Sequence, residues 1–126
     1  MGKKQKLVPF EYIIDENKKT VVYAVKAHGM LFVGTARCGE HDEFDVERGK
    51  AIAQIRANIA QRKCDLELTR EFISTVKLER DRNIRYSGVA SPHYMRAIQS
   101  ATAEERAQLV HIKELKDRLK TYTLDM

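Results

Sequence analysis

The sequence predicts an α+β protein in which an N-terminal antiparallel β-meander of about three strands packs on a C-terminal long helical hairpin. Residues 7–38 hold three β-branched and aromatic segments separated by short polar or glycine turns, which is typical of a meander. After Gly49 there is no glycine until Gly88 and no proline until Pro92, and apolar residues recur at helical spacing. At 126 residues the chain is expected to form a single domain, 1–126.

The three expected strands are separated by Glu16–Lys19 and by His28–Gly29. The strands span residues 7–15, 20–27 and 30–38. Alternation along the second strand places Val21, Tyr23 and Val25 on one face. A glycine inside a strand, as at Gly34, indicates either a β-bulge or the close approach of another backbone or a ligand, and of the two we favour the bulge.

A short acidic turn separates the meander from the first helix. Asp42 and Asp45 are both suitable N-cap residues, and carboxylates near a helix start are favoured by the helix dipole. Phe44 is expected to anchor the helix start on the sheet. Carboxylates so close together, Glu43 included, also suit acid–base catalysis, but capping explains the cluster more simply. We therefore expect no enzymatic activity.

The first helix is expected to span residues 46–84. Ile52, Ile59, Leu66 and Ile73 recur every seven residues, as in a heptad seam. A break near Cys64–Asp65, where Asp65 caps a second helix, is the alternative. A helix of this length cannot bury its seam against three strands alone, so it needs a partner helix.

The second helical arm is expected to span residues 92–122. Gly88 suits the C-cap of the first helix, and Ser91 followed by Pro92 suits the start of the next. A short helix over 93–100 and a restart at the capping box beginning with Thr102 are also compatible with the sequence. The apolar repeat of this arm consists of Leu109, Ile112, Leu115 (or Lys116) and Leu119.

The composition favours an oligomer and is compatible with an anionic ligand. Charged residues make up 33% of the chain and tryptophan is absent, so the core of a monomer would be thin, and a homo-oligomer, a dimer or larger, is expected. The net charge of +5 suits a small anionic ligand or a nucleic acid, and it suits equally well a helical surface of mixed charges that faces only solvent. No secretory segment or apolar run of about 20 residues occurs. We therefore expect a cytoplasmic protein with reduced thiols and no membrane contact.

Candidate ligand-binding residues surround the connection between the helices and include one arginine earlier in the first helix. Arginine forks suit phosphate, amides suit a base edge, and aromatic rings suit stacking. The candidates are Arg56, Asn83, Arg85, Tyr86, His93, Tyr94 and Arg96. The structural alternative is that cations at the end of a helix complement its dipole.

A metal site has little support. Cys38 and His41 have the spacing of half a zinc site, but no second Cys/His pair accompanies them. No metal and no cofactor are expected.

The segment F-V-G-T-A-R-C-x-x-x-D-E-F-D-x-x-x-G-x-x-I-A, from Phe32 to Ala53, resembles small proteins of phages and prophages. In particular it resembles the Thoeris anti-defence family. The resemblance covers about residues 20–60 by motif and the rest by layout. It implies binding and sequestration, without cleavage, of cyclic ADP-ribose-type immune signals, assembly of dimers into larger oligomers and, in some members, a separate site for cyclic oligonucleotides. It also implies that Arg56 contacts the ligand, together with residues around the interhelical connection.

The expected function is therefore that of a phage-encoded, non-enzymatic sponge for a nucleotide-derived second messenger in the cytoplasm of an infected bacterium. One alternative is a small phage protein that binds nucleic acid through Lys3, Lys4 and Lys6 and the arginine cluster. The other is an assembly or adaptor protein whose heptad row builds a helical bundle without a ligand.

Overall fold

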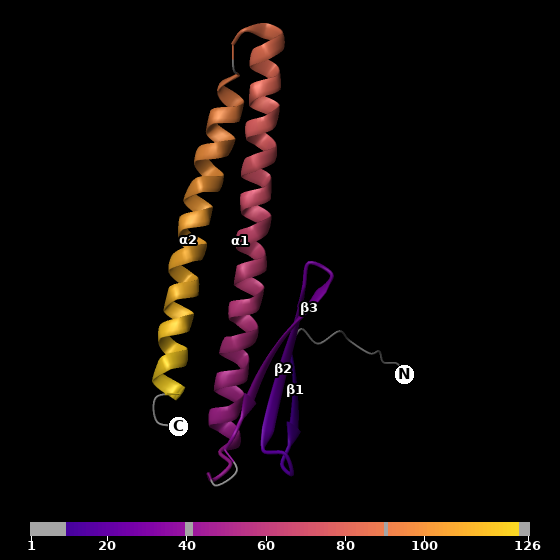
Figure 1. The fold of residues 1–126 in the computed structure, drawn as a ribbon, viewed down its shortest axis with the longest axis vertical. Coiled ribbons are helices and arrows are strands. Elements are labelled where there is room, and N and C mark those ends of the chain that lie inside the picture. Colours follow the sequence, from indigo (N-terminus) through magenta and orange to yellow (C-terminus); the bar gives the residue numbers. More distant parts are fainter. Residues whose placement is uncertain (1–9, 40–41, 90, 124–126) are drawn as a thin grey trace. The chain divides into compact units, whose positions relative to one another are not determined.

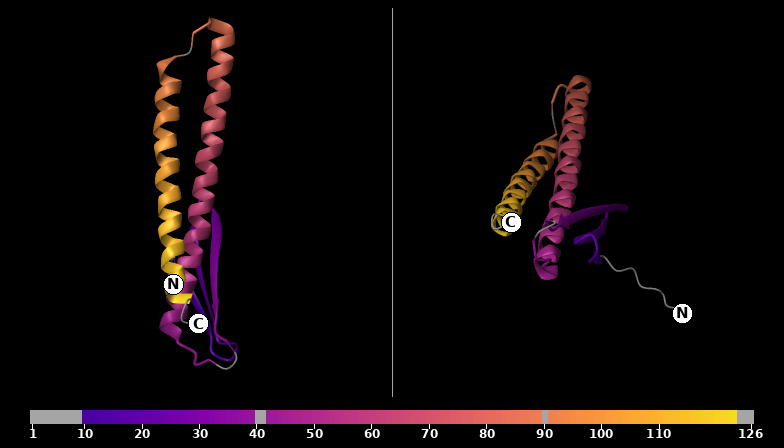
Figure 2. Two further views of the ribbon diagram at one scale, coloured as in Figure 1. Left: turned by 60° about the vertical axis from the view of Figure 1, so that its left-hand side comes forward. Right: turned by 60° about the horizontal axis from the view of Figure 1, so that its bottom comes forward.

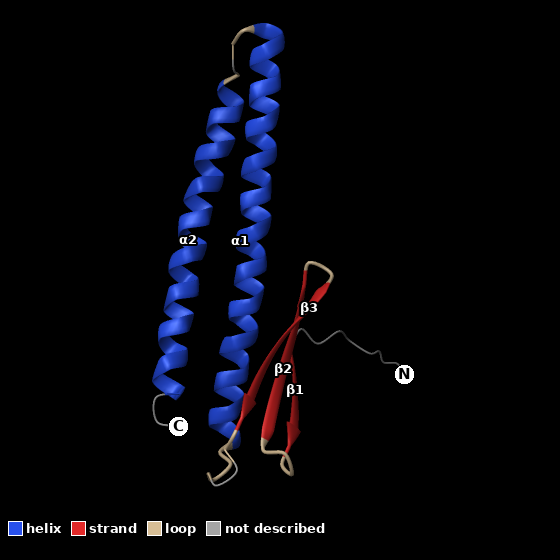
Figure 3. Cartoon of the chain, viewed as in Figure 1, coloured by secondary structure: helices blue, strands red, loops and turns tan. Residues whose placement is uncertain are grey.

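The computed structural model describes residues 10–39, 42–89 and 91–123, and it confirms the α+β fold class. A three-stranded antiparallel sheet packs against two long helices (Figure 1; Figure 3). The elements are β1 (Phe10–Asp15), β2 (Thr20–Ala27), β3 (Met30–Arg37), α1 (Val46–Ser87) and α2 (Pro92–Thr123). The basic tail with Lys3, Lys4 and Lys6, and His41 of the half-site, lie outside the described residues.

The chain forms two compact units. The first unit comprises residues 1–61 and 114–126, and so contains the sheet, the start of α1 and the end of α2. The second unit comprises residues 62–113, which are the rest of the two helices and their connection.

The sheet has the strand order β1-β2-β3, with each strand antiparallel to its neighbour. Lys19, His28 and Gly29 have positive φ angles of 51°, 55° and 72°, which is how the two tight turns reverse the chain. Val21, Tyr23 and Val25 are buried together, as the alternation predicts. The sheet therefore presents one apolar face to the helices.

Gly34 lies where the first helix comes closest to the sheet, and our preference for a β-bulge is wrong. The β2–β3 register runs without interruption through the pair Tyr23 and Gly34, so no extra residue is inserted. A Cβ atom built on Gly34 would lie 2.5 Å from the backbone nitrogen of Ala57 and closer still to the carbonyl oxygen of Ala53. The glycine is required because the backbone of α1 packs directly on the backbone of β3.

Asp45, rather than Asp42, caps the first helix. Its Oδ1 atom accepts a hydrogen bond from the backbone N–H of Arg48 at 3.2 Å, three residues into the helix. Phe44, immediately before the cap, packs against the core cluster that contains Val21 and Tyr23. The expectation that Phe44 anchors the helix start is confirmed.

The first helix is continuous from Val46 to Ser87, so the break at Cys64–Asp65 does not occur. Asp65 pairs instead with Arg62, at 3.5 Å, within the same helix. In the first unit Ile52 and Ile59 of the heptad row are buried, and in the second unit Leu66 is buried.

The second helix is likewise continuous, from Pro92 to Thr123. The restart at Thr102 is therefore wrong: its hydroxyl donates to the carbonyl of Ile98 one turn earlier, as serine and threonine do inside helices. Ile112 and Leu115 are buried as expected, and Lys116 is exposed. Leu109 is 43% exposed, so it does not belong to the buried row.

In the first unit the end of α2 lies beside the start of α1 (Figure 2). Ile55 and Ile59 of α1 form a buried cluster with Leu115 of α2. Arg48 donates two hydrogen bonds to the carbonyl oxygen of Tyr122, at 3.1 and 2.7 Å, and so satisfies one of the carbonyls left open at the end of α2. In the second unit an ion pair between Arg70 and Glu105, 2.7 Å long, links the two helices.

Candidate functional site

The connection between the two helices is built by caps on both sides. Gly88 has a φ angle of +80°, and its N–H donates to the carbonyl of Ile84 at 2.7 Å, which terminates α1. The hydroxyl of Ser91 accepts a hydrogen bond from the N–H of His93 at 3.3 Å, which starts α2 after an N-cap. Both expected caps are confirmed, and they fix the residues on either side of the connection.

Six of the seven predicted binding residues flank this connection, and we call them the loop-flanking cluster. They are Asn83, Arg85, Tyr86, His93, Tyr94 and Arg96. Tyr86 is 87% exposed, and Arg85, His93 and Arg96 are also exposed, whereas Asn83 and Tyr94 are half-buried. The rings of His93 and Tyr94 meet edge to face with their centroids 5.9 Å apart.

The charged residues of this cluster, Arg85 and Arg96, are both cationic, whereas the preceding turn of α1 carries the carboxylates of Glu79 and Asp81. Residues 82–100 contain three arginines and no aspartate or glutamate. One of these arginines, Arg82, pairs with Glu79 in the preceding turn at 3.2 Å. An anion that approaches the cluster therefore meets cations, aromatic rings and an amide, with no carboxylate from this stretch to repel it.

Arg56, the seventh predicted residue, belongs to the first unit. Its Nη1 atom donates to the carbonyl oxygen of Thr35 at 2.6 Å, and so ties α1 to β3. A guanidinium has five N–H donors, so this contact leaves most of its hydrogen-bonding capacity for a ligand. The structure thus gives Arg56 a packing role of its own.

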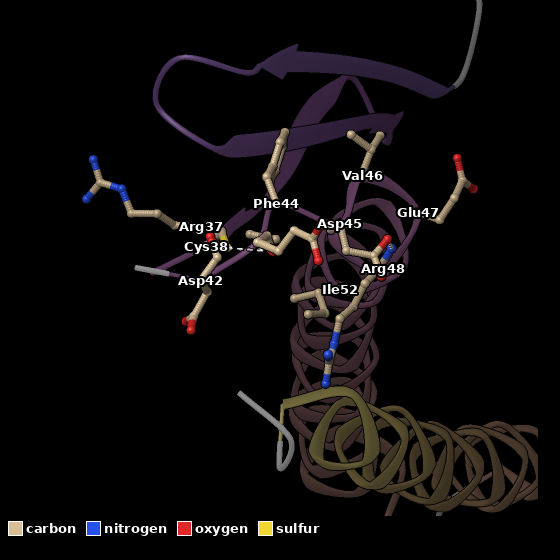
Figure 4. Close-up of a pocket in the computed structure, with 12 residues that line it drawn as sticks. Arg37, Cys38, Asp42, Phe44, Asp45, Val46, Glu47, Arg48 and Ile52 are labelled. Atoms are coloured by element: carbon tan, nitrogen blue, oxygen red, sulfur yellow. Dashed lines mark hydrogen bonds between the residues drawn. The ribbon is translucent and has the colours of Figure 1, made fainter. Parts of the chain in front are cut away.

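A cavity of about 560 Å³ lies in the first unit, between the end of β3 and the start of α1 (Figure 4). Its lining includes Cys38, Phe44, Arg48 and Ile52. Figure 4 shows the side chain of Arg37, which also lines the cavity, extending away from the other lining residues. Sequence reasoning did not identify this cavity, because a strand end and a helix start are brought together only by tertiary packing.

The acidic turn beside this cavity serves the structure. The thiol of Cys38 lies 3.6 Å from the carbonyl oxygen of Asp42 and 3.3 Å from that of Glu43, as a donor to both. The ammonium group of Lys19 donates to the same Asp42 carbonyl at 2.7 Å. These contacts hold the turn by its backbone, and the Asp45 side chain caps the helix.

Metal-ligating side chains do not gather in the described part of the chain. Within residues 10–39, 42–89 and 91–123, no group of three or more His, Cys, Asp or Glu side chains could hold a metal ion. Cys38 and Cys64 are both free thiols.

A shallow groove of about 470 Å³ lies between the helices of the second unit. Leu68 and Phe72 of α1 form one wall, and Ala97, Ser100 and Ala101 of α2 are part of the other. Sequence reasoning assigned no role to these residues. The sequence does contain a signal for this groove. Leu68 and Phe72 are large apolar residues four positions apart, so their side chains lie on one face of α1, outside the heptad row.

Comparisons with known proteins leave the family of this chain open. Neither the protein-family models, nor the curated proteins, nor the solved structures contain a match to it. Within the described residues, neither helix combines the length and the apolar character needed to cross a membrane.

Proposed function

We propose that this protein is a phage-encoded, non-enzymatic anti-defence protein of the Thoeris type, which binds and sequesters a nucleotide-derived immune second messenger. The ligand class is a cyclic ADP-ribose isomer, with cyclic oligonucleotides as candidates for a second site. The proposal starts from the resemblance of the Phe32–Ala53 segment, and the confirmed fold agrees with the layout which that resemblance implies.

The observation that carries the proposal is the loop-flanking cluster. Arg85 and Arg96 offer guanidinium forks for a pyrophosphate, and Tyr86 and Tyr94 offer faces for an adenine. Asn83 offers an amide for the polar edge of the base. A dinucleotide-like anion needs these groups together, whereas a purely structural helix end needs only the cations.

A complete pocket requires a second surface. Sites that retain small ligands cover most of the ligand surface, yet Tyr86 is 87% exposed in the isolated chain. We therefore propose that another copy of the chain closes the site, with Arg56 contributing to the phosphate contacts as the resemblance implies. This arrangement is also why a homo-oligomer belongs to the proposed function.

The test is capture and recovery of the ligand. The purified protein is incubated with each cyclic ADP-ribose isomer, passed through a desalting column and heat-denatured, and the released material is identified by mass spectrometry. We expect recovery of one isomer, intact and in proportion to the protein. Recovery of a hydrolysed product, or of no isomer, contradicts the proposal.

Variants locate the site. Arg85→Gln and Tyr86→Ala are expected to lower the retained ligand at least about tenfold, because each removes a direct contact. Arg106→Gln, which removes an exposed arginine from the same unit outside the cluster, is the matched control and should retain the ligand. A gel shift with DNA or RNA that weakens steeply with salt, in a protein that retains no isomer, would favour the nucleic-acid alternative.

A further inference from the structure

The sheet has a second face, turned away from the core, that is unusually apolar. The β1–β2–β3 register places Ile13, Val22 and Thr35 in one row of this face and Glu11, Ala24 and Val33 in the next. We call the outward-pointing residues the outer face. Their described members are Ile13, Asp15, Thr20, Val22, Ala24, Lys26, Leu31, Val33, Thr35 and Arg37.

The exposure of this face is large for an antiparallel sheet. Ile13, Leu31 and Val33 are 60, 65 and 47% exposed. A sheet with one face on a core normally turns polar residues to water on the other face. Adjacent exposed apolar side chains of this kind mark interaction surfaces rather than ordinary scattered surface residues.

Two charges of the outer face, those of Asp15 and Arg37, are arranged in a self-complementary way. The register places Asp15, Thr20 and Arg37 in a single row, with Asp15 on one edge strand and Arg37 on the other edge strand. The two charges flank a depression of about 350 Å³ whose lining includes Ile13 and Val22. Within the described residues, the Arg37 side chain takes part in no hydrogen bond or ion pair.

A two-fold axis parallel to the strands matches these charges. Rotation about an axis along β2, between two stacked sheets, places β1 of one copy over β3 of the other and leaves each row at the same height. Asp15 then faces the partner's Arg37, and the symmetry repeats the same contact on the other side. An axis across the strands instead places β1 over β1, so that the two charges do not meet.

We propose that the outer face of the sheet binds the outer face of a second copy of this chain, with Asp15 of each copy paired to Arg37 of the other. The apolar rows interdigitate in the centre and the two ion pairs lie at one end, whereas at the other end Lys26 of each copy lies over the same residue of the partner and weakens the contact. This contact does not rest on any ligand, and it is distinct from the surface that closes the loop-flanking cluster. A face three strands wide, at a strand spacing of about 4.8 Å, is small for an interface, so the association is concentration-dependent.

Two charge-reversal variants test the pairing. Asp15→Arg leaves only arginines at the two positions, and Arg37→Asp leaves only aspartates, so each variant alone carries two repulsive contacts in place of two ion pairs. We expect each to self-associate at least about tenfold more weakly than the natural chain in sedimentation-velocity measurements. An equimolar mixture restores both attractive pairs, so the mixture should associate with an affinity close to that of the natural chain.

Recovery in the mixture is independent of folding defects in either variant. Asp15 also accepts a hydrogen bond from the N–H of Lys18 at 3.1 Å, so its replacement loosens the β1–β2 turn, yet a loosened turn cannot produce association on mixing. A mixture that associates no better than its components, when both variants are folded by circular dichroism, overturns the proposal.

The apolar centre of the face has its own test with a matched control. Ile13→Glu places a charge in the contact, whereas Leu78→Glu makes the same kind of change at a helix position of nearly equal exposure, 64%. We expect Ile13→Glu to lower the mass of the assembly and Leu78→Glu to leave this contact intact. Equal association of Ile13→Glu and the natural chain, both folded by circular dichroism, contradicts the proposal. Ligand recovery from these variants is measured separately, so failure of the dimer contact and failure of the proposed function remain distinguishable.

Discussion

The contact between β3 and α1 makes a sharp prediction at Gly34. Replacement by alanine adds one methyl group, and that methyl would lie 2.5 Å from the backbone nitrogen of Ala57 and still closer to the carbonyl of Ala53. Both obstacles are backbone atoms of a helix, so no side chain can rotate out of the way. The helix must move off the sheet, and with it Ile52 and Ala53, which belong to the buried core.

The size of the effect follows from two opposing terms. Overpacking a rigid core costs about 1–3 kcal/mol, and the upper end applies because the obstacle is backbone. Alanine also lowers the conformational entropy of the unfolded chain, and this stabilises the folded state by roughly 0.4–1 kcal/mol. We therefore expect Gly34→Ala to lower the free energy of unfolding by about 2 kcal/mol.

Urea denaturation followed by circular dichroism and tyrosine fluorescence measures this change. Gly29→Ala is the control, because its Cβ meets nothing within 4 Å and only its positive φ angle opposes the substitution. We expect a cost of about 1 kcal/mol for the left-handed backbone there. The second substitution Ala57→Gly should not rescue Gly34→Ala, since it removes a side chain that is not the obstacle. If Gly34→Ala unfolds at the same urea concentration as the natural chain, the close packing of α1 on β3 is refuted.

Two further predictions concern the helix start and the buried tyrosine. Asp45→Ala should lower the free energy of unfolding by about 1 kcal/mol, because it removes the N-cap of α1. Asp42→Ala should change the free energy of unfolding by less than about 0.5 kcal/mol, because Asp42 holds the turn through its backbone carbonyl, which alanine keeps. Equal effects of the two substitutions in urea denaturation would contradict the assignment of the cap. Burial, and secondarily the neighbouring Tyr12 hydroxyl, raise the pKa of Tyr23 above its ordinary value of 10.0. Because the neutral form is favoured in the folded state, this stability is fully present below pH 10 and is lost as pH rises through the folded pKa. Tyr23→Phe should therefore flatten the loss of stability above pH 10, and an unchanged alkaline unfolding profile would show that Tyr23 is not the group responsible.

Several parts of the fold were predictable because they depend on local sequence. The inward alternation of Val21, Tyr23 and Val25 has the period of a strand, and one face of the sheet is buried, so no other register hides these side chains. The caps at Gly88 and Ser91 were predictable for a similar reason, since a positive φ angle and a side-chain acceptor are requirements of single positions.

The errors share a physical cause. A glycine in a strand and a capping box at Thr102 are genuine local signals, but tertiary packing decides whether the chain uses them. At Gly34 the signal marked the close approach of a helix backbone instead of an inserted residue. At Thr102 the hydroxyl bonds back to Ile98, and the helix continues through the signal.

The candidate site divides in the same way. The residue types around the connection, with three arginines and no carboxylate over 82–100, are a property of the sequence. Their placement on the two sides of a capped connection, with Tyr86 exposed and Tyr94 half-buried, is a property of the folded chain. The packing role of Arg56 against the Thr35 carbonyl was not foreseeable, because it joins residues 21 positions apart.

By itself, then, the sequence determined the fold class, the strand faces, the caps at Gly88 and Ser91 and the cationic character of the interhelical connection. These features follow from periodicity, from backbone requirements at single residues and from composition, all of which act over a few neighbouring positions. The tertiary structure alone decided which aspartate caps α1, why Gly34 must be glycine and that Asp15 and Arg37 share one row of an exposed apolar face. The last two features depend on the contact between β3 and α1 and on strand register, which bring together residues that lie apart in the chain.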